Sequence, residues 1–342
     1  MQKVRKNMFA IIALVVGTVA ILFLLLSVGF SNILDALSKV QISYIVLALA
    51  ITILGLVIRG ARRFIYVSES GCQTNIRTIF TILLSGSFFE NVSPARLGEF
   101  FVPIALNSRD KIIASSTLSA IIVERTADLA FASIIALLGL LSFNLTSEIQ
   151  FILFIGIIIT LVLIVFILHL TRILAVIVNQ AKRVLSFFRK KEPSESDGSL
   201  QNLLKTAKTN VSFLLKSKRG TIFGITLTGL LWSLNGIRLL VVMKSVGLEI
   251  PWPQATVVVV FTILLALASM VPFGHGTAEF AMVFILTSMG FPLVLATVVA
   301  IIDRFLAVWL VILIGLVASL RLNQFNSQNR GDEHIGRRIK IE

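Results

Sequence analysis

Charged side chains interrupt the apolar stretches of this sequence. A charge at the centre of a membrane helix costs about 2.5–3.5 kcal/mol on insertion scales, so a chain keeps it there for pairing or for function. Arginine can hold a phosphate in a fork of two hydrogen bonds, and carboxylates can hold the arginine or exchange protons. The pattern therefore indicates a polar path for an anionic group. Its residues are Glu90, Arg96, Glu99, Glu124, Arg125, Asp128, His275, Glu279, Asp303 and Arg304.

The densest group is Glu124, Arg125 and Asp128. Glu124 and Asp128 are four residues apart and share one face of a helix, and Arg125 lies three residues before Asp128. We predict that Arg125 is neutralised by Asp128 or Glu124. Two interpretations are open for the group: ion pairs that pin helices together, or arginines that receive a phosphate while carboxylates hold them.

Two stretches that contain proline and glycine, Glu90–Glu99 and Pro272–Glu279, separate short apolar pieces, and we call them the two breaks. Such residues end helices and free backbone N–H groups, and the N-terminus of a half-helix attracts anions. The alternative for the glycines is close helix packing, and for His275 a hydrogen-bonded tip residue is favoured over a proton switch. Together with Arg96, Glu99 and Glu279, the break residues that we expect along a transport path are Asn91, Pro94, Gly98, Pro272, Gly274 and Gly276.

The composition shows what kind of protein holds these charges. The 342 residues are 56% hydrophobic, and the mean hydropathy is +0.96. Only 14% of the residues are charged, whereas about 25% are charged in soluble domains. A soluble enzyme, a disordered chain and a secreted disulfide scaffold are excluded, and the single Cys72 forms no internal disulfide. No metal-ligand spacing, phosphate-binding loop or nucleophile elbow is present, so we expect no cofactor and no metal.

Apolar runs of sufficient length predict an all-α polytopic membrane protein with about six full spanning helices. Two further runs, Ile76–Phe89 and Ala255–Val271, are followed by the breaks and by short apolar pieces, Phe100–Leu106 and Phe280–Met289. We predict that each forms a re-entrant helical hairpin. The spanning runs are Met8–Phe30, Ile42–Ile58, Ile112–Phe143, Phe151–Leu170, Thr221–Met243 and Leu293–Leu320.

The positive charges predict the orientation in the cell membrane. Segments 1–7, 59–111, 171–220 and 321–342 contain 26 of the 31 lysines and arginines, and cytoplasmic loops carry such an excess. Both termini are therefore expected in the cytoplasm, and the net charge of +14 needs no nucleic-acid partner. Basic residues near the helices also favour contact with anionic lipid, although topology alone would place them there.

The chain is expected to be one integral membrane domain with an internal repeat. Arg62, Gly71, Glu99 and Glu124-Arg125 recur in order as Arg238, Gly247, Glu279 and Asp303-Arg304. With the deduced orientation, the two units are inverted, and matched interrupted segments indicate a transporter binding site. The expected parts are a first unit at 42–143, a cytoplasmic basic loop at 171–220 with a flexible linker at Lys190–Ser199, a second unit at 221–320 and a cytoplasmic tail at 321–342.

Three motifs occur in order: the stretch from Asn91 to Glu99, Glu124-Arg125-Thr126-Ala127-Asp128, and the stretch from Pro272 to Glu279. Together they resemble the lysylphosphatidylglycerol synthase transmembrane region family, also called flippase-like proteins. The resemblance implies a membrane region that moves a lipid between leaflets. Full-length synthases of this kind add a soluble aminoacyl-transferase domain, which we do not expect in this chain, and stand-alone relatives are associated with polyprenyl-linked sugar or cell-envelope pathways.

Three functions are therefore weighed. The first is a lipid flippase or scramblase without its own ATPase, in which an anionic or lipid-linked headgroup passes between the hairpins. The second is the membrane part of a phospholipid-modifying synthase that needs a separate catalytic domain, and the third is an ion-coupled small-solute transporter. The expected partners are a membrane phospholipid or polyprenyl-linked lipid and a separate synthase or glycosyltransferase.

Overall fold

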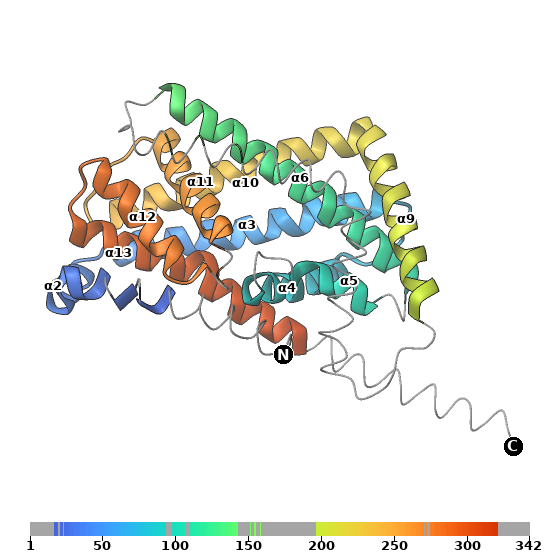
Figure 1. Ribbon diagram of the computed structural model, residues 1–342, viewed down its shortest axis with the longest axis horizontal. Coiled ribbons are helices and arrows are strands. Elements are labelled where there is room, and N and C mark those ends of the chain that lie inside the picture. Colours follow the sequence, from blue (N-terminus) through green and yellow to red (C-terminus); the bar gives the residue numbers. More distant parts are fainter. Residues whose placement is uncertain are drawn as a thin grey trace, which may run out of the picture.

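The computed structural model describes residues 17–19, 21–22, 24–93, 98–106, 110–142, 151, 154, 158, 196–269, 271 and 274–320. This part of the chain is helical and contains no strand, which confirms the all-α prediction. Figure 1 shows long helices running across the molecule, with shorter helices packed around them. After an N-terminal helix at Gly17–Val28, the elements are α2 (Phe30–Ser38), α3 (Ile42–Glu69), α4 (Ile76–Val92), α5 (Phe101–Leu106), α6 (Lys111–Ser142), α9 (Ser196–Lys216), α10 (Lys218–Ser245), α11 (Trp252–Ala268), α12 (Thr277–Ser288), α13 (Leu293–Arg304) and the π-helix η3 (Phe305–Trp309).

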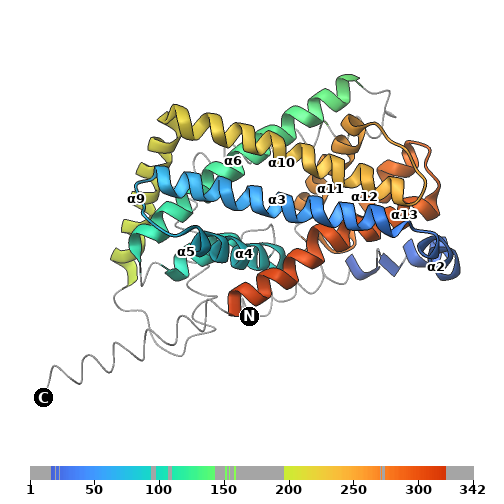
Figure 2. The ribbon, with the colours of Figure 1, turned by 180° about the vertical axis from the view of Figure 1, so that it is seen from behind.

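Helices α3 and α10 form an antiparallel pair at the centre of the molecule, and they lie side by side in both ribbon views (Figures 1 and 2). Each helix has 28 residues. The Gln41 amide, before α3, donates to the Ser245 carbonyl at the end of α10 at 2.9 Å. At the opposite end, the Ser217 hydroxyl donates to the Glu69 carboxylate at 3.0 Å. The pair is therefore joined at both ends.

Three helices are long and apolar enough to cross a membrane among the residues that the structure describes. They are Ile42–Glu69, Lys218–Ser245 and Leu293–Leu320, which agree with three of the predicted spans. The helix Gly17–Val28 meets α2 at 79°, and this bent pair is a fourth candidate if it is one span. The predicted span at 151–170 lies outside the described residues apart from three isolated positions.

Helices α4 and α11 are both too short to cross a bilayer. Each has 17 residues, or roughly 26 Å at 1.5 Å per residue, against about 30 Å of hydrocarbon. Helices α11 and α12 form a hairpin: the Ser269 and Thr277 hydroxyls lie 3.0 Å apart at its tip, and the Phe261 and Phe284 rings stack further along it. The two short apolar helices α11 and α12 are therefore paired with each other.

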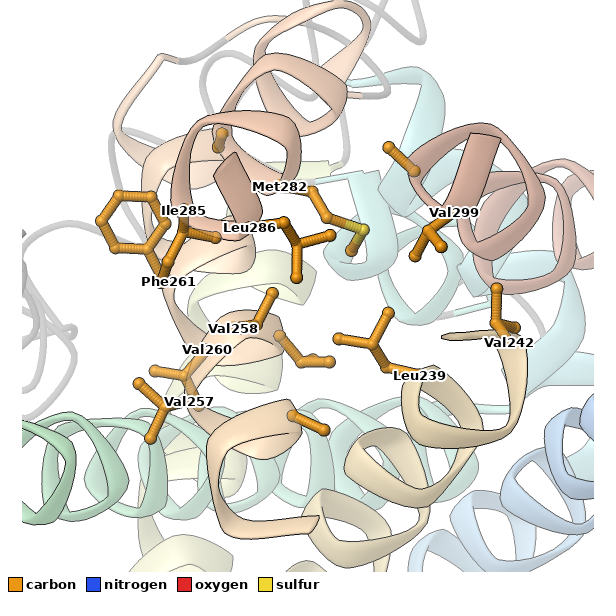
Figure 3. Close-up of a cluster of buried hydrophobic side chains, with 14 of the residues drawn as sticks. Leu239, Val242, Val257, Val258, Val260, Phe261, Met282, Ile285, Leu286 and Val299 are labelled. Atoms are coloured by element: carbon orange, nitrogen blue, oxygen red, sulfur yellow. The ribbon is translucent and has the colours of Figure 1, made fainter. Parts of the chain in front are cut away.

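The largest apolar core surrounds this hairpin (Figure 3). Valines and Phe261 of α11 face Met282, Ile285 and Leu286 of α12, and Leu239, Val242 and Val299 close the cluster from α10 and α13. These side chains are buried inside the protein and not at its surface. The core therefore fixes the hairpin against α10 and α13.

The segment 171–220, predicted as a cytoplasmic basic loop, contains helix α9 at Ser196–Lys216, so the prediction of a flexible linker is wrong for residues 196–199. The sequence feature that indicates this helix is an apolar face, because Leu203, Ala207 and Leu214 recur at helical spacing and are buried. Leu203 and Ala207 share a core cluster with Leu118 of α6. The polar and basic opposite face hid this pattern in the sequence, and the start of the predicted flexible linker, 190–195, lies outside the described residues.

Candidate functional site

A buried arginine of α3 joins two carboxylates from other helices. Arg63 is 1% exposed. Its Nη2 donates to Glu99 Oε1 at 2.6 Å, and its Nε donates to Glu124 Oε1 at 3.2 Å, with a second bond from Nη2 to Glu124 Oε2. Arg63 therefore connects α6 to the short helical turn before α5.

The same Glu99 is held from the other side by Arg125 of α6. Arg125 Nε and Nη2 donate to Glu99 Oε2 at 3.0 and 2.5 Å, and Nη2 also lies 3.0 Å from Glu90 Oε2 on α4. The prediction that Arg125 pairs with Asp128 or Glu124 is therefore wrong. Residue 125 lies about 100° around the helix from residue 124, so its side chain faces α4 and the turn before α5 while Glu124 faces α3.

Arg62 and Arg59 of α3 complete this group. Arg62 donates to both oxygens of Asp128, at 2.7 and 3.1 Å, and to the Thr228 hydroxyl of α10 at 2.8 Å. Arg59 lies 3.5 Å from Glu90. Among the residues that the structure describes, this first network contains four arginines and four carboxylates, so the formal charges of these eight side chains balance. Its members are Arg59, Arg62, Arg63, Arg125, Glu90, Glu99, Glu124 and Asp128.

A smaller second network lies between α10, α12 and α13. Arg238 donates from Nε to Asp303 Oδ1 at 2.9 Å and from Nη1 to Asn235 Oδ1 at 2.8 Å. Arg304 donates from Nε to Glu279 Oε1 at 3.2 Å. The π-helix η3 begins directly after Arg304, and such segments are frequent at functional sites.

The two networks are connected in the same way. In each, an arginine of a 28-residue helix pairs with the acid of an acid-Arg dipeptide: Arg63 with Glu124, and Arg238 with Asp303. The arginine of that dipeptide then donates to a glutamate at the end of one of the two breaks between helices, Glu99 or Glu279. The counterpart of Arg238 in these ion pairs is therefore Arg63, and not Arg62 as the sequence pattern predicts, because Arg62 pairs with Asp128.

A cavity of about 170 Å³ opens beside the second network. One wall is apolar and comes from Ile21, Leu24 and Leu25 of the N-terminal helix. The polar side is formed by Glu279, Arg304 and His275, and the His275 ring contacts the Trp309 ring edge-on at 6.5 Å between centroids. The site thus joins one carboxylate and one guanidinium to a space with apolar walls.

The break residues have different surroundings. Gly276 has φ +76° and lies so close to the Gly17 backbone that a Cβ would overlap it, and Gly274 also has positive φ at +59°. Gly98 packs against the Phe89 carbonyl, which agrees with the packing interpretation of the glycines. Asn91 donates to the Ser87 carbonyl of its own helix at 2.8 Å and joins neither network.

Three predicted path residues, Pro94, Arg96 and Pro272, lie outside the described residues. Conversely, Arg59, Arg62, Arg63 and Arg238 were not among the predicted path residues, because the first three were assigned to a cytoplasmic segment. The signal that identifies them is their spacing, since positions 59, 62 and 63 share one helix face. No group of His, Cys, Asp or Glu suited to a metal ion occurs in the part of the chain that the structure describes.

Comparison with known proteins identifies a family and relatives that are membrane proteins. The sequence profile of a family described as "Lysylphosphatidylglycerol synthase TM region" matches residues 10–315. A UPF0104 membrane protein of Methanocaldococcus jannaschii is 24% identical over 97% of this chain and 100% of its own length. Another, from Methanothermobacter thermautotrophicus, is 22% identical over 90% of this chain and 94% of its own length.

Proposed function

The chain belongs to the lysylphosphatidylglycerol synthase TM region family, and from this premise we propose that it moves a lipid headgroup between the leaflets of the cell membrane. The headgroup is anionic or polyprenyl-linked, and no ATPase of the chain's own drives it. The observation that carries the proposal is the matched pair of networks, in which Arg125 holds Glu99 and Arg304 holds Glu279. Two such sites in one membrane protein are a costly arrangement that favours a transport role.

The proposal includes an inverted repeat of units 42–143 and 221–320. Several observations support it: α3 and α10 have equal lengths and run antiparallel, and α4 and α11 have equal lengths. The glycines that follow α3 and α10, Gly71 and Gly247, share a positive φ of +79° and +77°. In this arrangement, α4–α5 and α11–α12 are hairpins that enter the membrane from opposite sides, and both termini are cytoplasmic.

The path for the headgroup runs along the accessible edges of the two networks. In the first network, Arg59, Arg125 and Asp128 are 27%, 22% and 22% exposed at their side chains, whereas Arg63 and Glu99 are buried. In the second network, the cavity reaches Glu279 and Arg304. The headgroup would pass from one accessible arginine to the next while its tails stay in lipid.

The membrane surface is a second lipid contact in this proposal. Lys205, Lys208 and Lys216 of α9 are exposed, and each basic residue near an anionic bilayer contributes about 1 kcal/mol. Anionic lipid at the cytoplasmic face would therefore hold α9 beside the membrane.

The experiment is translocation of a headgroup-labelled phospholipid in proteoliposomes. Vesicles are reconstituted with the purified chain, and an impermeant reductant is added outside to quench accessible label. We expect the reductant to reach label from both leaflets in protein-containing vesicles and only outer-leaflet label in protein-free vesicles. Equal quenching in the two preparations would contradict the proposal.

The family description favours a second candidate, the membrane part of a lipid-modifying synthase. This function needs a catalytic domain or a partner synthase or glycosyltransferase. It predicts that the chain forms a stable complex with such an enzyme and leaves labelled lipid in its original leaflet. Uptake of a small solute without lipid movement would instead indicate an ion-coupled solute transporter.

A further inference from the structure

Glu99 and Glu279, the glutamates at the two breaks between helices, differ in the number of hydrogen bonds that hold their carboxylates. Glu99 is fully buried and accepts hydrogen bonds at both oxygens, from Arg63 at Oε1 and from Arg125 at Oε2. Glu279 accepts one bond, from Arg304 Nε to Oε1 at 3.2 Å. Its Oε2 is buried and has no hydrogen-bond partner among the residues that the structure describes. The first glutamate is therefore fixed in its network, and the second is held at one oxygen.

The unbonded oxygen of Glu279 belongs to a side chain that lines the cavity. The residue is 9% exposed, and the cavity of about 170 Å³ is large enough for several waters or one phosphate group. A buried carboxylate oxygen without a donor is costly. The site can lower that cost by binding a proton at Glu279.

Few other charges face this carboxylate. Arg304 from α13 and His275 from the hairpin tip line the same cavity, while Asp303 is occupied by Arg238. Helix α11, η3 and residues 17–28 contain no ionisable side chain, and Glu279 is the one ionisable residue of α12. Among the described residues, Arg304 is therefore the charged group that contacts Glu279 directly.

We infer that a phosphate group and the Glu279 carboxylate compete for the Arg304 guanidinium, and that the displaced Glu279 takes up one proton. Before binding, Arg304 and ionised Glu279 form a neutral pair. Afterwards, Arg304 and the phosphate anion form the neutral pair and Glu279 is a neutral acid, so the buried charge is unchanged. When the phosphate leaves, Glu279 releases the proton and pairs with Arg304 again. The inference rests on the proposed function. It states that Glu279 takes up one proton each time a headgroup enters this site.

The competition follows from the chemistry of the two anions. Glu279 occupies Nε of Arg304, and a phosphate that guanidinium holds side-on in bidentate fashion needs Nε together with one Nη, so the two anions compete for Nε. A displaced, ionised Glu279 would be an uncompensated buried charge, which a protein avoids by neutralising the group. Glu99 is excluded from such a role because two arginines would have to release it together.

The test measures proton uptake when a phosphate ligand binds. The full-length chain in detergent is titrated with short-chain phosphatidylglycerol by calorimetry, in buffers with different enthalpies of ionisation. We expect uptake of about one proton per lipid and, above the pH at which Glu279 ionises, an affinity that falls about tenfold per pH unit. Wild-type binding without proton uptake anywhere between about pH 5 and pH 8 overturns the inference, and this measurement needs no variant.

Three variants assign the proton. Glu279→Gln imitates the protonated residue, so it should bind the lipid without proton uptake and with little pH dependence. Glu249→Gln, an exposed carboxylate in the same half, should behave as wild type. His275→Gln should keep the uptake, and loss of uptake in this variant would assign the proton to His275 and overturn the inference.

Two further measurements complete the test. One distinguishes a lipid phosphate from free phosphate, and the other distinguishes failure of this inference from failure of the proposed function. Inorganic phosphate replaces the lipid in a parallel titration, and equal proton-linked binding would show that the site takes free phosphate. If wild-type protein translocates labelled lipid but binds it without proton uptake, the inference alone fails. If it neither binds nor translocates lipid, the proposed function fails as well.

Discussion

Arg125 holds one oxygen of Glu99 with two nitrogens, at 3.0 and 2.5 Å, across 26 positions of sequence. The bond joins the middle of α6 to the turn that precedes α5, so a charge pair defines where the chain re-forms a helix after its first break. Arg304 and Glu279 repeat this relationship 25 positions apart in the second half. In each half, an arginine of a later helix, α6 or α13, therefore holds the glutamate that follows the interruption between two helices.

Removing the central arginine of the first network should destabilise the protein strongly. Arg63→Ala leaves Glu99 and Glu124 buried with one partner fewer each, and breaking a buried pair typically costs 3–5 kcal/mol. We expect a clear fall in folded yield and in melting temperature of the detergent-solubilised protein. Arg219→Ala, at an exposed position, is the control, and equal melting temperatures would contradict a buried network.

Neutralising the two glutamates should separate folding from transport. Glu99→Gln weakens three charge-assisted bonds, one from Arg63 and two from Arg125, each contributing about 1.5–3 kcal/mol, so its melting temperature should fall. Glu279→Gln weakens one long bond and should fold almost as wild type while its transport changes. Size-exclusion profiles and thermal melts check this contrast, and a larger fall for Glu279→Gln would show that the second network is the structural one.

The hairpin tip should reject a side chain at Gly276. Gly276→Ala meets two penalties: a left-handed conformation, which costs roughly 1–2 kcal/mol, and overlap with the Gly17 backbone. Gly71→Ala is the matched control because it has the same positive φ and open space around it. Thermal melts should therefore rank wild type above Gly71→Ala and Gly71→Ala above Gly276→Ala. Identical melting temperatures for the two variants would contradict the close contact between Gly276 and the Gly17 backbone.

Orientation can be tested with exposed positions at opposite ends of the α9–α10 region. An impermeant maleimide applied to intact cells should label Lys244→Cys, at the end of α10, and should spare Lys208→Cys on α9; both positions are exposed. Cys72 is replaced by Ser in the background, although burial raises the pKa of its thiol and slows its reaction. Labelling of Lys208→Cys and not Lys244→Cys would invert the proposed topology.

The sequence was sufficient for the elements that depend on local patterns. The apolar runs located α3, α10 and the helix Leu293–Leu320, because a long apolar helix is determined by its own residues. The breaks before Glu99 and Glu279 were visible as proline and glycine clusters. The acid-Arg dipeptides at 124 and 303 were visible as charges in an apolar context.

Features that depend on tertiary contacts could not be predicted in the same way. The pairing of Arg125 with Glu99 is set by which face of α6 meets the turn before α5, and helical spacing alone favoured Asp128. The apolar run ends at Ile58 and so predicts that the arginines of α3 lie in a loop, whereas the helix continues to Glu69. Helix α9 was missed because its apolar face becomes recognisable only against α6.

Lipid translocation by an Arg304 variant tests the central claim most directly. Loss of the headgroup's bond to arginine removes about 1.5–3 kcal/mol, so Arg304→Gln in proteoliposomes should translocate headgroup-labelled phospholipid roughly ten- to a hundredfold more slowly than wild type. Glu249→Gln, reconstituted at the same protein density, should keep the wild-type rate. A well-folded Arg304→Gln protein that translocates lipid at the wild-type rate, or wild-type protein no faster than protein-free vesicles, would contradict the account.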